Sequence, residues 1–243
     1  MNDHFIPNGR AYMEIKKMGA VMFGFFMLVW LFINHIESVS AEDHLTDVLN
    51  GIRKQYADLP GLSIPYQREI ISSSMALLGD NGMADQATGE IFLKSPYLIR
   101  VEQKTPDPET LTSDGKTLWW YIPMKKQVFE YPSARLGKEL FLFIDIFLGL
   151  KEIGESFDVM QSGLGEDGAI QLTLIPNPRW EEIDHINILV DRNHFQIRKV
   201  EIQNTIGGIT RFILGKFNVE KRLTEDFFRF AVPEDVTVIK EDG

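Results

Sequence analysis

The chain has 243 residues, a net charge of −10 at pH 7 and no cysteine. An acidic chain is poorly suited to nucleic acid or an anionic membrane surface, because both attract clustered Lys and Arg. Without cysteine the sequence offers no disulfide, no cysteine nucleophile and no thiol to acylate.

An apolar segment from Met18 to Ile33 follows Lys16-Lys17 and precedes the small residues Val39-Ser40-Ala41. This layout is typical of a secretory signal peptide, and the segment is shorter than the ~20 residues of a spanning helix. We predict a signal peptide at 1–41, cleaved after Ala41, and an exported domain at 42–243 that keeps the charge of −10. An uncleaved anchor and a true start at Met13 remain alternatives.

Apolar residues recur with helical spacing after the cleavage site. They are Leu45, Val48, Leu49, Ile52 and Tyr56. The spacing predicts a helix from Glu42 to Tyr56, which the turn signal at 58–61 ends.

Most later segments have the composition and alternation of strands. We expect strands at 62–72, 87–93, 97–103, 109–113, 116–122, 127–131, 157–161, 169–175, 183–190, 196–203, 210–217 and 227–238, the last interrupted at Pro233. Asp114-Gly115 is a hairpin signal between two of them. About eleven short strands at hairpin spacing predict a mainly β (α+β) fold, a meandering antiparallel sheet curled into a barrel.

One segment, from Lys138 to Leu150, breaks this pattern. It is too long and too uniformly apolar for a surface strand, so we predict a buried or cavity-facing helix that ends near Gly149. Apolar side chains occupy more than one face of this helix. One face can pack on the sheet, and the other needs cover or a ligand. Ordinary core packing is the alternative for each phenylalanine.

Trp119, Trp120 and Tyr121 are consecutive on a predicted strand, so alternate side chains face opposite sides. Trp120 shares a face with Leu118, and Trp119 shares the other with Tyr121. One pair is expected to line the interior, and the sequence leaves open which. Docking of a partner on an edge strand is the alternative.

Two segments resemble enzyme or metal-binding motifs, but the structure predicted around them does not support either function. The glycines at 163–168 match a dinucleotide fingerprint, but a strand follows where the fingerprint needs a helix, so we expect a hairpin loop. The acidic run Glu181-Glu182 with Asp184 and His185 is typical of a solvated turn. No Gly-x-Ser-x-Gly motif occurs. We therefore predict no catalytic residue, no metal site, no cofactor and no enzymatic activity.

Two stretches carry a family resemblance. The first is the Gly-x-x-x-x-Lys-x-Pro segment at 89–96, followed by Arg100 and by the Ser-Asp-Gly-Lys-Thr-Leu-Trp core within 111–123. The second is Phe-Arg-Phe-Ala-Val-Pro at 228–233, followed by Val-Thr-Val at 236–238. Together they resemble LolA, the periplasmic carrier of outer-membrane lipoproteins.

The resemblance implies an open barrel of about eleven antiparallel strands, with a helical lid over an apolar cavity for acyl chains. It implies a monomer in the Gram-negative periplasm, which takes acylated lipoproteins from an inner-membrane ABC transporter to an outer-membrane receptor. The cavity residues expected are Phe92, Leu98, Trp119, Trp120, Phe141, Phe143, Ile144 and Phe147.

The sequence departs from the family pattern at three places. Ser95 stands where members commonly have the arginine of Lys-Arg-Pro, which is implicated in pinning the lid. A serine offers no guanidinium fork, so Lys94 and Arg100 are the candidates for the latch. Ile99 replaces a common aromatic residue, and Tyr66-Gln67 is the nearest match to Phe-x-Gln.

Two other functions use the same fold. One is a carrier of another lipid, which the Ser95 departure keeps open. The other is a lipid-sensing regulator of the envelope. Such regulators carry an additional C-terminal domain, whereas this sequence ends five residues after Val238, which disfavours that function.

Overall fold

The computed structural model describes residues 41–73, 85–132, 147 and 153–240. The chain divides into two compact units, Met1–His44 and Leu45–Gly243. The predicted signal peptide lies outside the described residues except for Ala41, and the predicted helix at 138–150 lies outside them except for Phe147. Within the described ranges, no helix has the length and apolarity needed to cross a membrane.

The predicted N-terminal helix is confirmed as α2 (Ala41–Tyr56). Val48, Ile52 and Tyr56 are spaced four residues apart, and all three are buried in the core. The Tyr56 hydroxyl accepts a hydrogen bond from the backbone N–H of Ile197 at 2.9 Å. Burial raises the pKa of Tyr56 far above its usual range, so this phenol stays protonated. The helix is therefore held by one apolar stripe and one buried hydrogen bond.

The strand predictions are largely confirmed, within a few residues at the ends. The strands are β1 (Leu62–Ile71), β2 (Asp85–Lys94), β3 (Leu98–Thr105), β4 (Glu109–Ser113), β5 (Thr117–Ile122), β6 (Gln127–Pro132), β7 (Phe157–Leu164), β8 (Ile170–Pro176), β9 (Ile183–Val190), β10 (Ile197–Asn204), β11 (Ile209–Leu214), β12 (Asn218–Val219) and β13 (Thr237–Lys240). The short helices are η2 (Pro123–Lys125), α5 (Ile153–Ser156), η5 (Glu166–Gly168) and η6 (Glu225–Phe228).

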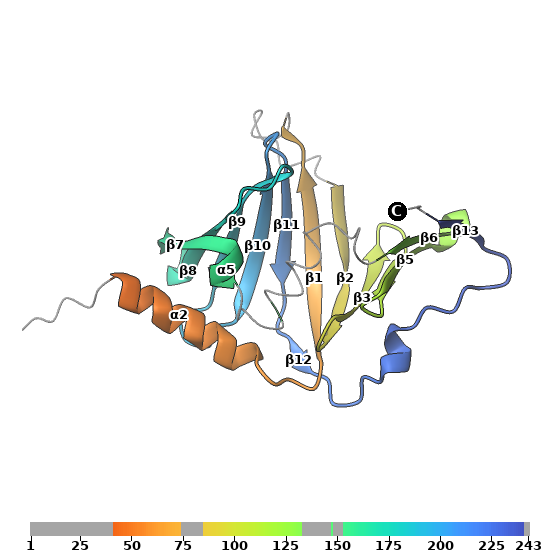
Figure 1. The fold of residues 1–243 in the computed structure, drawn as a ribbon, viewed down its shortest axis with the longest axis horizontal. Coiled ribbons are helices and arrows are strands. Elements are labelled where there is room, and N and C mark those ends of the chain that lie inside the picture. Colours follow the sequence, from red (N-terminus) through yellow and green to blue (C-terminus); the bar gives the residue numbers. More distant parts are fainter. Residues whose placement is uncertain (1–40, 74–84, 133–146, 148–152, 241–243) are drawn as a thin grey trace, which may run out of the picture. The chain divides into compact units, whose positions relative to one another are not determined.

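These thirteen strands of the described residues form one sheet in the order β13-β6-β5-β4-β3-β2-β1-β11-β10-β9-β8-β7, with β12 beside β1 (Figure 1). Two antiparallel meanders, β1 to β6 and β7 to β11, join through the antiparallel pair β1–β11. Only β13 runs parallel to its neighbour, β6, among the pairs described. Because β7 and β13 are separate edges of this order, the sheet is open. The mainly β, open antiparallel fold is confirmed.

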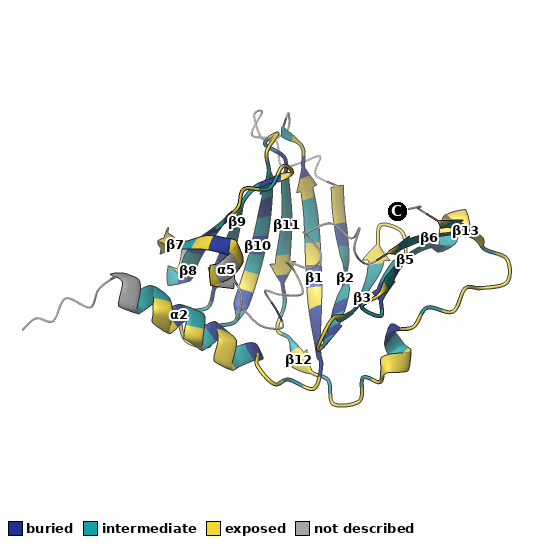
Figure 2. Ribbon diagram, in the orientation of Figure 1, coloured by how far each residue is buried: buried dark blue, intermediate teal, exposed yellow. Residues whose placement is uncertain are grey.

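The core follows the alternation of the strands, as the burial pattern in Figure 2 shows. On β8 and β9, the directly opposed pairs Leu172–Ile188 and Leu174–Ile186 are almost completely buried. Each fully buried aliphatic side chain contributes about 1.5–3 kcal/mol. Side chains of α2 pack into the same core, which fixes the helix against this meander.

The predicted hairpin at Asp114-Gly115 is confirmed between β4 and β5. One Asp114 carboxylate oxygen accepts hydrogen bonds from the backbone N–H groups of Lys116 and Thr117, both at 2.9 Å. Gly115 has a φ of +86°, which glycine adopts without strain. Turn chemistry thus accounts for the Ser-Asp-Gly-Lys-Thr motif. The hairpin predicted at 163–168 is likewise found between β7 and β8: β7 extends to Leu164, and η5 lies in the connection that follows.

The predicted strand at 227–238 is wrong except at its end. Residues Glu225–Phe228 form η6, and a strand begins only at Thr237. The aromatic residues of this stretch pack on strand side chains instead of alternating within a ladder. The Phe230 ring lies 6.4 Å from the ring of Trp119 and 5.5 Å from that of Tyr121, centroid to centroid. Pro233 also lacks the N–H that a ladder requires.

Candidate functional site

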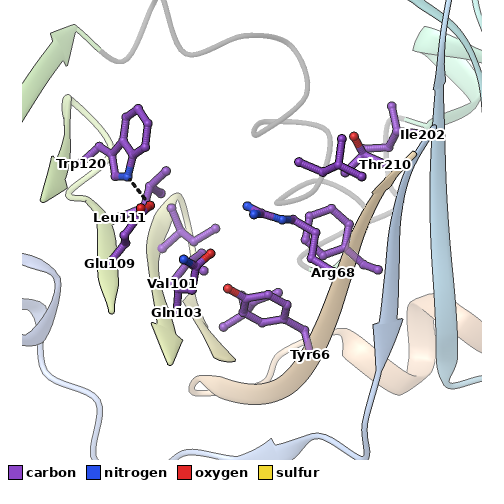
Figure 3. Close-up of a pocket in the computed structure, with 13 residues that line it drawn as sticks. Tyr66, Arg68, Val101, Gln103, Glu109, Leu111, Trp120, Ile202 and Thr210 are labelled. Atoms are coloured by element: carbon purple, nitrogen blue, oxygen red, sulfur yellow. Dashed lines mark hydrogen bonds between the residues drawn. The ribbon is translucent and has the colours of Figure 1, made fainter. Parts of the chain in front are cut away.

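A cavity of about 400 Å³ lies against one face of the sheet. Its lining comes from β1 to β5, β10 and β11, and Figure 3 shows these side chains pointing toward a common space. The volume is within the ~300–1,000 Å³ range of small-molecule sites. Its apolar lining includes Ile91, Ile99, Val101, Leu111, Trp120 and Phe212.

Strand register explains why these side chains gather. Val101 lies opposite Ile91 on β2 and opposite Leu111 on β4, and Leu111 lies opposite Trp120 on β5. Directly opposed residues share a face of the sheet, so the four form one continuous apolar row. This row places Trp120, and not its neighbour Trp119, on the cavity face.

Polar groups interrupt the apolar lining at a few points. Trp120 donates from Nε1 to a Glu109 carboxylate oxygen at 2.9 Å. Burial raises the pKa of the Tyr66 hydroxyl, while the positive charge of Arg68 lowers it and the negative charge of Glu109 raises it. The polar groups of Tyr66, Arg68 and Glu109 thus belong to one largely apolar lining. Such a lining holds an apolar body and orients one polar group.

Phe92, Leu98 and Trp119 lie elsewhere. The Phe92 ring meets the Phe227 ring at 5.0 Å, and Trp119 stacks on Phe230, so both contact the C-terminal segment. Leu98 is half-buried, pairs with Lys94 and is not one of the lining residues. Phe92, Leu98 and Trp119 are therefore left out of the candidate site, because they alternate with the residues that line it.

Phe147 is fully buried, with its ring 5.6 Å from that of Tyr56 in an edge-to-face arrangement. It packs in the core with α2. The other residues predicted on that helix, Phe141, Phe143 and Ile144, lie outside the described residues.

The two latch candidates hold the C-terminal segment. Lys94 donates from Nζ to the carbonyl oxygen of Leu223 at 2.7 Å. Arg100 donates from Nη1 to the carbonyl oxygen of Phe227 at 3.2 Å, and its Nε donates to Glu102 at 2.7 Å. A role in pinning a lid stays a prediction, because the helix expected to form it lies outside the described residues.

Sequence reasoning missed most of the cavity lining. Tyr66 and Arg68 come from β1 and Phe212 from β11, and these strands pair with each other. Alternation along each strand could have grouped such residues, because positions two apart share a face. The pairing of β1 with β11 joins distant parts of the sequence, and no local pattern indicates it.

Comparison with known proteins yields a consistent set of relatives. A family model described as the outer membrane lipoprotein carrier protein LolA matches residues 76–231. An outer-membrane lipoprotein carrier protein of Azotobacter vinelandii is 27% identical over 171 residues, which cover 70% of this chain and 79% of that protein. Its counterpart in Pasteurella multocida is 27% identical over 195 residues, which cover 78% of this chain and 85% of that protein.

A crystal structure of a LolA superfamily protein from Nitrosomonas europaea is also similar, with a TM-score of 0.43 and 11% identity, covering 76% of this chain and 97% of that one. The family match extends over more than half of the chain, from before β2 to the segment that follows η6. The chain belongs to the LolA family of outer membrane lipoprotein carrier proteins.

Proposed function

We propose that this protein carries acylated lipoproteins across the periplasm. Residues 1–41 direct export and are cleaved after Ala41, and the domain at 42–243 then acts as a monomer. It receives cargo from an inner-membrane ABC transporter and delivers it to an outer-membrane receptor. Membership of a family of carriers supports a binding role, in which no bond is made or broken.

The observation that carries the proposal is the apolar cavity on the sheet. Each buried methylene contributes about 0.8 kcal/mol, so an acyl chain crosses an aqueous compartment only inside such a shelter. The row from Ile91 to Trp120 supplies a continuous apolar surface, and Phe212 adds an aromatic ring beside it. Acyl chains are the ligand class that this lining fits.

Two adjacent residues of β11 provide a matched test of the cavity. Phe212 lines it, whereas Ile213 is exposed and alternates to the other side of the strand. In Phe212→Glu, a carboxylate enters the apolar space, and we expect lipoprotein capture to fall at least tenfold. Ile213→Glu introduces the same group outside the cavity, and capture should remain within about twofold. Release of a radiolabelled lipoprotein from inner-membrane vesicles measures capture directly.

Mass spectrometry of the protein purified from its native periplasm identifies the cargo and the N-terminus together. We expect co-purified triacylated lipoprotein and a chain that starts at Glu42. Equal loss of capture in both β11 variants, with both still folded by circular dichroism, would remove this cavity from the mechanism. Recovery of the uncleaved N-terminus would contradict the free carrier.

A further inference from the structure

Arg68 is the cationic side chain of the cavity lining, and its charge has no ion-pair partner among the residues that the structure describes. Figure 3 shows its guanidinium pointing into the cavity from β1. Its Nε is inaccessible to solvent and makes no hydrogen bond, and no ion pair joins Arg68 to any residue that the structure describes. Its cross-strand neighbours are Ala87 and Phe212, neither of which carries an acceptor on its side chain.

The nearby Arg211 shows how the same sheet neutralises an arginine elsewhere. Arg211 on β11 lies opposite Glu69 on β1 and Glu201 on β10. It binds their carboxylates at 2.8 Å and 2.6 Å respectively. Glu69 follows Arg68 directly in the chain and therefore faces the other side. Both carboxylates thus lie on the non-cavity face, and neither of them neutralises Arg68.

Glu109 is the carboxylate among the lining residues, and it belongs to another group. Its Oε2 accepts the hydrogen bond from Trp120 on β5, and it makes no ion pair with Arg68. The Arg68 guanidinium therefore borders the cavity without an ion pair to Glu109. Leaving a charge unpaired in apolar surroundings is costly, and a guanidinium fork matches a carboxylate or phosphate.

We infer that the cavity binds acidic amphiphiles, whose oxyanion pairs with Arg68 while their acyl chain lies along the apolar row. This inference rests on the cavity of the proposed function and extends its ligands beyond lipoproteins. A fatty-acid carboxylate and a lipid phosphate present the same chemistry to the guanidinium. A neutral head group gains only an ordinary hydrogen bond.

Three probes of equal chain length separate these cases: dodecanoic acid, dodecyl phosphate and dodecan-1-ol. Displacement of the neutral dye N-phenyl-1-naphthylamine reports their affinities below the concentration at which they form micelles. We expect the full-length mature protein to bind at least one acidic probe roughly tenfold tighter than the alcohol, as a charge-assisted hydrogen bond implies. Comparison of the two acids identifies carboxylate or phosphate as the preferred head group.

Arg68→Gln should remove this preference and leave the affinity for dodecan-1-ol within about twofold, which also shows that the cavity is intact. Arg68→Lys should retain part of the preference, because the charge remains. Arg211→Gln is the matched control, since it removes a guanidinium from the other face of the neighbouring strand. It should keep the full preference.

Equal affinity for acid and alcohol in the wild-type protein, or an unchanged preference in Arg68→Gln, would overturn the inference and leave the acyl-chain cavity standing. Failure of all three probes to displace the dye would overturn both the inference and the cavity. Selective acid binding without lipoprotein capture would instead contradict the proposed carrier function alone.

Discussion

The guanidinium of Arg100 lies over the ring of Phe227, with its central carbon 4.8 Å from the ring centroid. The same guanidinium donates a hydrogen bond to the backbone carbonyl of Phe227. A side chain of β3 thus holds both the ring and the backbone of η6, and through them the C-terminal segment. Lys94 donates a second hydrogen bond to this segment. Its acceptor is the carbonyl oxygen of Leu223, which lies two residues before η6 begins.

Arg100→Met should therefore destabilise the protein. The methionine keeps the apolar stem but loses the cation–π contact, the carbonyl hydrogen bond and the Glu102 ion pair. We expect the free energy of unfolding in urea to fall by about 1–3 kcal/mol. Arg229→Met is the control, because the Arg229–Asp226 pair is mostly exposed and contributes at most about 0.5 kcal/mol. Similar losses in both variants would contradict a specific role for Arg100.

Asp114 should be the most sensitive side chain of the β4–β5 turn. Asp114→Ala leaves two backbone N–H groups without their acceptor, and we expect a loss of about 1–2 kcal/mol in the free energy of unfolding. Lys116→Ala changes an exposed side chain of the same turn and should cost less than about 0.5 kcal/mol. Urea denaturation of the two variants separates these outcomes. Equal stability of both would show that the turn does not depend on this carboxylate.

Local chemistry explains which parts of the fold the sequence predicts. The apolar stripe of α2 and the Asp114-Gly115 turn depend on neighbours within a few residues, so the sequence alone predicts both. Gly89, which begins the first family motif, is explained only by tertiary structure. A Cβ there would collide with the backbone carbonyl of Glu102 on β3. A glycine at this position allows β2 and β3 to approach.

The candidate site was harder to predict because it depends on register and face. The sequence does not show which of Trp119 and Trp120 faces the cavity. The strand register from Ile91 through Val101 and Leu111 shows that it is Trp120. The strand predicted at 227–238 is wrong for a related reason. Phe228, Arg229 and Phe230 alternate apolar and polar residues as a strand does, but the rings of Phe227 and Phe230 pack on aromatic rings of β2 and β5. Periodicity cannot distinguish these two uses of an aromatic side chain.

Asp191 should make the β9–β10 turn sensitive to acid. The backbone N–H of His194, and then the His194 ring and the Asn193 N–H, lower the pKa of the Asp191 carboxyl in the folded protein through their hydrogen bonds. A folded pKa below the unfolded one stabilises the protein above about pH 4, and this contribution is lost as pH falls through the folded value.

Asp191→Asn should therefore melt about 1–3 °C below the wild-type protein at pH 7, with the difference shrinking toward pH 3. Asp235→Asn, at an exposed carboxylate 3.9 Å from Lys126, should match the wild-type protein throughout. Thermal melts at a series of pH values test both. A difference between Asp191→Asn and wild type that is constant with pH would exclude the carboxylate charge as the cause.

Trp120 should report directly on ligand in the cavity. An acyl chain that displaces water from the indole should shift its fluorescence to shorter wavelength. In Trp120→Phe this shift should disappear, while affinity falls by less than about tenfold, because the phenyl ring keeps most of the apolar contact. Titration of the mature protein with dodecan-1-ol provides the measurement.

Trp119→Phe is the matched control, since Trp119 stacks on Phe230 outside the cavity lining. It should retain the full ligand-induced shift, although loss of the larger ring lowers its melting temperature. The two adjacent tryptophans thus assign the ligand to one face of β5. Loss of the shift in Trp119→Phe, with the shift kept in Trp120→Phe, would place the acyl chain on the face that η6 and the C-terminal segment contact.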